Sequence, residues 1–123
     1  MRIIKQLFYL SNFVLFIFYL YPGSILGCFI YNDCKIQPQL TGDFLVSSNH
    51  VYVFFVISVL GFIAFKNKLK NLFIYLIFIS IILELSHLVI PERGFEIPDL
   101  FGNIIGVLLS FLILKIVYKG RYK

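Results

Sequence analysis

Four apolar segments, each close to the length of a membrane-crossing helix, are the feature that most constrains how this chain folds. They cover roughly residues 3–22, 48–65, 71–90 and 98–117, and the second is the shortest. About 20 apolar residues in an α-helix span the hydrocarbon core of a bilayer, where a lipid-exposed backbone must satisfy its own hydrogen bonds. The sequence therefore predicts an all-α fold, a four-helix transmembrane bundle that forms a single domain over residues 1–123.

The composition supports this class. The chain is 60% hydrophobic and only 14% charged, with a mean hydropathy of +0.94, whereas a soluble domain is about half apolar and about a quarter charged. The net charge of +5 is typical of some nucleic-acid-binding proteins. Here the charges gather at the ends of apolar segments, so we expect no nucleic-acid partner.

The distribution of cationic residues predicts the orientation. With a cytoplasmic N-terminus, only Lys35 and Arg93 of the 11 cationic residues fall outside. Cytoplasmic ends of membrane helices carry an excess of Lys and Arg, so we expect both termini in the cytoplasm. The residues then placed inside are Arg2, Lys5, Lys66, Lys68, Lys70, Lys115, Lys119, Arg121 and Lys123.

The first apolar segment ends at the helix-breaking pair Pro22–Gly23. It has a second interpretation as a signal peptide, because residues 24–28 fit the loose pattern of a bacterial lipoprotein cleavage site. That pattern is short and degenerate, and the other helices need a packing partner. We therefore expect a membrane helix that is retained.

Residues 23–48 are predicted to form a mixed polar loop that contains both cysteines, Cys28 and Cys34. In an oxidising compartment these two residues would close a small disulfide loop. The alternative is a pair of free thiols. The sequence leaves both open.

Polar residues interrupt the third and fourth apolar segments near their predicted outer ends. Glu84 and His87 are three residues apart and share a helix face. Asp99 and Asn103 are four apart on the next helix, and Arg93 lies in the short loop between the two helices. Ionisable groups at membrane depth are expensive and by default indicate a functional site.

Each residue of this group also has a purely structural interpretation, such as a hydrogen bond between helices, a helix cap or a solvated loop charge. The convergence of several polar groups favours a site. The candidate catalytic residues are Glu84, His87 and Asp99, and the candidate ligand-binding residues are His50, Arg93 and Asn103.

Glu84 needs a partner, because an unpaired carboxylate about two helical turns inside the bilayer costs several kcal/mol. The candidates within one hydrogen bond or one water are Asn103, His50 and Arg93. Small residues allow helices to approach closely, so we expect Gly102, Gly106 and Ser110 to pack the fourth helix against the third.

Three chemistries fit these residue types. Arg93 can bind a phosphate or carboxylate bidentately, and Glu84 with His87 can act as an acid–base pair. Two His with carboxylates also suit a divalent metal. The sequence lacks an HExxH pattern, so no metal site is predicted, and no cofactor is identified.

Over about residues 48–112 the chain resembles the VanZ-like family of small bacterial membrane proteins. The resemblance is carried by a His at the start of the second helix, E-x-x-[Q/H], P-x-R, an acidic residue and N-x-x-G. In this chain the pattern reads His50, Glu84-x-x-His87, Pro91-x-Arg93, Asp99 and Asn103-x-x-Gly106. The family usually has Gln where His87 stands and often a second Gly where Ser110 stands.

The resemblance implies a multi-pass protein of the bacterial cytoplasmic (inner) membrane, in a family linked to glycopeptide (teicoplanin) resistance. We expect an outward-facing polar site that engages an anionic ligand, either membrane lipids or a lipid-linked envelope precursor. The alternatives are a structural or accessory subunit and a small intramembrane hydrolase or transferase. A transporter is disfavoured for a four-helix monomer, although a homo-oligomer would provide a pathway.

Overall fold

The computed structural model describes residues 1–121, with Arg121 described by its backbone alone, and over this range the chain contains helices and no strands. This confirms the all-α prediction. The elements are α1 (Arg2–Leu20), α2 (Ile25–Tyr31), α3 (Ser48–Ala64), the 3₁₀ turn η1 (Lys66–Lys68), α4 (Leu69–Ser86) and α5 (Ile97–Arg121).

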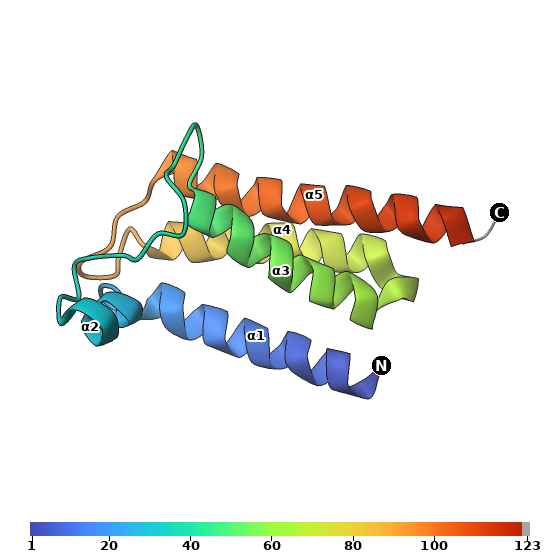
Figure 1. The fold of residues 1–123 in the computed structure, drawn as a ribbon, viewed down its shortest axis with the longest axis horizontal. Coiled ribbons are helices and arrows are strands. Elements are labelled where there is room, and N and C mark those ends of the chain that lie inside the picture. The colour runs from blue at the N-terminus through green and yellow to red at the C-terminus, as the bar shows by residue number, and fades with distance from the viewer. Residues whose placement is uncertain (122–123) are drawn as a thin grey trace.

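The long helices α1, α3, α4 and α5 lie side by side (Figure 1). α3 packs most extensively on α5 and also contacts α1, and α4 contacts α5. Residues 21–47, which include α2, and residues 87–96 gather at one end, here called the loop end. The N-terminus, η1 and the last turns of α5 lie at the opposite end.

Three of these segments are long and apolar enough to cross a membrane. They are Arg2–Leu20, Lys66–Ser86 and Ile97–Gly120, with mean hydropathies of 1.7, 1.8 and 2.3. α3 is apolar but shorter, at 17 residues. Large apolar side chains also point outward, as at Phe78 and Ile116, which suits a surface in contact with lipid.

The glycines of α5 allow its close approach to α3. A Cβ on Gly106 would lie 2.6 Å from the carbonyl oxygen of Val51, and a Cβ on Gly102 would lie 2.7 Å from that of Ser47. We expected these glycines to face the predicted helix over residues 71–90, which is α4 in the structure. That expectation is wrong, because they face α3. Ser110 is also fully buried, and its hydroxyl donates to the Val107 carbonyl.

The segment predicted as a loop over residues 23–48 contains the short helix α2. The Ser24 hydroxyl caps this helix by accepting a hydrogen bond from the Gly27 amide at 3.0 Å. Cys28 within α2 is joined to Cys34 by a disulfide, which is one of the two states that the sequence left open.

The two helices that flank the 87–96 loop have different limits from those predicted. α4 ends at Ser86 rather than at residue 90, and residues 87–89 continue as tighter turns in which each amide bonds three residues back. Pro91 disfavours helical geometry at the residue before it, so the predicted helix should not have included residue 90. α5 continues to Arg121 rather than stopping at residue 117.

Candidate functional site

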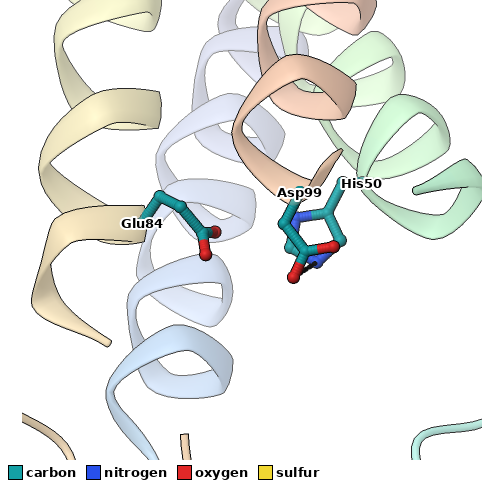
Figure 2. A group of neighbouring side chains, drawn as sticks. All are labelled: His50, Glu84 and Asp99. Atoms are coloured by element: carbon teal, nitrogen blue, oxygen red, sulfur yellow. Dashed lines mark ion pairs between the residues drawn. The ribbon is translucent and has the colours of Figure 1, made fainter. Parts of the chain in front are cut away.

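The polar side chains of three helices meet at the loop end. Figure 2 shows Glu84 of α4 with its carboxylate directed toward Asp99 of α5 and His50 of α3. One ligand-type atom from each residue lies within 4.8 Å of the others. This is the one-water proximity between Glu84 and His50 that the sequence led us to expect, while the chemical roles of these residues stay predictions.

Glu84 is the most enclosed member of the group, with none of its surface exposed. Its Oε1 is 3.3 Å from His87 Nδ1 and accepts a hydrogen bond from the Glu96 amide, also at 3.3 Å. Its Oε2 has no hydrogen-bond partner among residues 1–121. Burying a carboxylate oxygen without a hydrogen-bond donor costs free energy, so Oε2 is the atom of this site that needs a further partner.

His87 joins Glu84 to α1. Its Nε2 lies 3.2 Å from the Tyr19 carbonyl oxygen, and because a carbonyl only accepts hydrogen bonds, Nε2 carries a proton. The other ring nitrogen faces Glu84 Oε1. A hydrogen bond between His87 Nδ1 and Glu84 Oε1 needs one proton between the two atoms, and such a contact is what an acid–base pair requires.

His50 is oriented by Asn103 and Tyr19. Its Nδ1 is 2.8 Å from Asn103 Oδ1 and 2.7 Å from the Tyr19 hydroxyl, which itself donates to Asn103 Oδ1 at 2.9 Å. Asn103 Nδ2 donates to the Ser80 carbonyl, which sets the direction of the amide. The Asn103 carbonyl oxygen only accepts, so Nδ1 of His50 carries a proton.

The remaining ring nitrogen of His50, Nε2, faces Asp99 Oδ2 at 3.5 Å. Both side chains are about one-fifth exposed, so they lie at the mouth of the site while Glu84 lies at its base. The carboxyl groups of Glu84 and Asp99 both lie near the imidazole of His50. This part of the site is therefore suited to protons or cations.

Tyr19 is a member of the cluster that the sequence interpretation missed. It is only 6% exposed, its ring stacks on His87 with centroids 5.0 Å apart, and its edge meets His50. An aromatic residue in an apolar segment gives no polar signal. The spacing of Tyr19 does give a signal, because Tyr19 lies seven residues after the polar Asn12 and therefore on the same, buried face of α1.

Arg93 was one of the expected partners of Glu84, and the structure does not pair the two side chains. Its Nη2 donates to the Phe18 carbonyl at 2.8 Å, in the last turn of α1. A cation at this position satisfies an end carbonyl and is favourable at the negative end of the helix dipole. Arg93 pairs with no carboxylate among residues 1–121.

Arg93 also borders a cavity of about 220 Å³ at the loop end. Lys35 lines the same cavity, next to the disulfide residue Cys34. The other lining residues are Gly23, Ser24, Gln37 and Glu92. The two cationic residues predicted for the outer face are thus brought to one cavity.

Comparison with protein-family models, curated proteins and solved structures found no match to this chain. The resemblance to the VanZ-like family rests on the residues quoted above. Four residues of the quoted pattern, His50, Glu84, Asp99 and Asn103, lie close together in the structure.

Proposed function

We propose that this chain is a VanZ-like, multi-pass protein of the bacterial cytoplasmic membrane that engages an anionic, lipid-linked ligand at its loop end. In this proposal α1, α3, α4 and α5 all cross the membrane and both termini are cytoplasmic. The apolar lengths of three of these helices support the membrane location. The link of the VanZ-like family to glycopeptide resistance would then reflect a role in the cell envelope.

The placement of charges along the helices supports the orientation. α1 begins with Arg2 and Lys5, η1 and the start of α4 carry three lysines, and α5 carries Lys115 and Lys119 in its last turns. All of these lie at the end opposite the loops. The Cys28–Cys34 disulfide lies at the loop end, and disulfides persist in oxidising compartments.

The observation that carries the proposal is the cavity shared by Lys35 and Arg93. These are the two cationic residues of the predicted outer face, and a guanidinium and an ammonium together attract a phosphate or carboxylate group. Arg93 is held by its bond to α1, while Lys35 is exposed. The position fits an anionic headgroup presented at the membrane surface.

A binding measurement with purified protein in nanodiscs tests this function. Nanodiscs of phosphatidylcholine would receive increasing amounts of phosphatidylglycerol, and bound lipid would be resolved by mass spectrometry. A Lys or Arg near an anionic surface contributes about 1 kcal/mol, so Lys35→Gln should weaken retention of the anionic lipid about fivefold. Arg93→Ala should weaken it at least as much.

Lys119→Gln, at the opposite end, is the matched control and should leave binding at the loop end unchanged. Adding inorganic phosphate separates recognition of a free anion from recognition of a lipid headgroup. If the site recognises the anion alone, a low concentration of phosphate should displace the bound lipid; if it recognises the whole headgroup, it should not. Equal retention of anionic and zwitterionic lipid by the wild type, unchanged in Lys35→Gln, would contradict the proposal.

A structural or accessory role is the second candidate. It is favoured by the bonds that join α1, α3 and α5 through Tyr19, His50 and Asn103, and by the cap that Arg93 gives α1. An enzymatic version instead uses Glu84 and His87, which are in contact, as an acid–base pair. Glu84→Gln separates the two roles. Loss of function in a variant that still folds would show that the ionisable group is needed, whereas loss of assembly would indicate the structural role.

A further inference from the structure

We propose that His50, Glu84 and Asp99 form a binding site for a divalent cation of the zinc type. This inference goes beyond the proposed function and does not depend on the cavity of Lys35 and Arg93. In the sequence the residue types suit a divalent metal, but no site was predicted, and the three residues are spread over 50 positions with no metal-binding spacing. The site exists only because α3, α4 and α5 meet at the loop end (Figure 2).

The distances suit a common ion. Nitrogen and oxygen ligands about 2.1 Å from a tetrahedral zinc ion lie about 3.4 Å apart, and His50 Nε2 and Asp99 Oδ2 are 3.5 Å apart. The whole set of three ligand atoms lies within 4.8 Å. Binding of a common ion would therefore draw the third ligand closer to the other two by up to about 1.4 Å.

The unpartnered oxygen of Glu84 is an independent reason to expect a ligand. Glu84 is fully buried, yet its Oε2 has no hydrogen-bond donor among the residues that the structure describes. Its carboxylate points toward the other two residues (Figure 2). A cation between Glu84 and Asp99 would satisfy this oxygen and neutralise the two carboxylates together.

The hydrogen bonds of His50 prepare its free nitrogen for a metal. A metal-bound imidazole usually donates its other N–H to a carbonyl or carboxylate, which fixes the tautomer and the ring direction. His50 does this through Nδ1 to Asn103 Oδ1, and in the neutral imidazole the Nε2 lone pair then faces Asp99. Tyr19 and Asn103 are therefore positioning residues for the ligand.

The ligand set indicates the class of cation. One imidazole and two carboxylates suit zinc or another first-row divalent ion better than calcium or magnesium, which prefer oxygen ligands alone. Three protein ligands also leave a tetrahedral ion with one open position, as in catalytic rather than structural zinc sites. A water or an anionic ligand would take that position.

Equilibrium dialysis of untagged, chelator-treated protein against Zn²⁺ in detergent tests the site. The wild type should bind about one Zn²⁺ per chain. Losing an outer-shell partner typically weakens metal affinity about 10- to 100-fold, so Glu84→Gln and Asp99→Asn, which remove ligands, should each lose at least tenfold. The matched control Glu96→Gln changes an exposed carboxylate at the same end and should bind as the wild type does.

A second measurement keeps the test decisive if a variant is unstable. Co²⁺ bound to the wild type should give the intense visible absorption of a tetrahedral site, and His50→Gln should shift that spectrum while circular dichroism shows an intact fold. Wild-type protein that binds no more Zn²⁺ than the Glu84→Gln, Asp99→Asn double variant would overturn the proposal. So would an equal loss in Glu96→Gln.

Discussion

Replacing Gly106 by Ala tests the packing that positions the site. The added Cβ would lie 2.6 Å from the Val51 carbonyl oxygen and 2.8 Å from the Phe55 amide nitrogen. Both are backbone atoms of α3, which no side-chain rotation can move, so α3 and α5 must separate. Overpacking of this kind costs about 1–3 kcal/mol, against a gain of about 1 kcal/mol from the better helix propensity of Ala.

Gly106→Ala should therefore destabilise the protein by up to about 2 kcal/mol in net terms. Gly120→Ala is the matched control, because a Cβ there meets no atom of the described residues within 4 Å, and it should be neutral or stabilising. The assay is reversible unfolding in mixed micelles followed by circular dichroism. A Gly106→Ala protein as stable as Gly120→Ala would refute the close approach of α5 to α3.

Three further outcomes follow from the loop-end contacts. Tyr19→Phe removes hydrogen bonds to His50 and Asn103 and should cost about 1 kcal/mol of stability, whereas the exposed Tyr9→Phe should cost nothing measurable; equal effects would contradict the buried role of Tyr19. Cys28→Ser should lower stability by about 2 kcal/mol through loss of a short disulfide loop, and two free thiols in the mass spectrum of non-reduced wild type would contradict the bond. A cysteine introduced near Asp43 or Glu96 should react with an impermeant reagent from outside, whereas one at Asn67 should not, and the reverse pattern would invert the topology.

The helices could be predicted from the sequence because lipid imposes a strong local constraint. An apolar segment of about 20 residues has few alternatives to a helix, and α1, α4 and α5 follow from this. The polar group of Glu84, Asp99 and Asn103 was also predictable, because polar residues stand out against apolar surroundings. Short helices lack such a signal, and α2 depends on the Ser24 cap and on the Cys28–Cys34 bond.

The partners of individual residues could not be predicted, because they depend on which helices are neighbours. Gly102 and Gly106 mark a close-packing face in the sequence, but only the three-dimensional arrangement shows that α3 lies against it. Arg93 was a candidate partner of Glu84, and it bonds instead to the end of α1. Tyr19 could not be told apart in the sequence from the other aromatic residues of the first apolar segment, and tyrosine hydroxyls usually lie at the membrane surface.

A double-mutant cycle between Glu84 and Asp99 tests most directly whether residues of separate helices form one site. Unfolding free energies would be measured for Glu84→Gln, Asp99→Asn and the double variant in the presence of a chelator. Residues that share one network couple by about 0.5–3 kcal/mol, and we expect a value in that range, because carboxyl oxygens of the two residues lie within 4.8 Å of each other. Additivity within about 0.3 kcal/mol, equal to that of a control cycle between Glu84 and the exposed Asp33, would contradict the shared site.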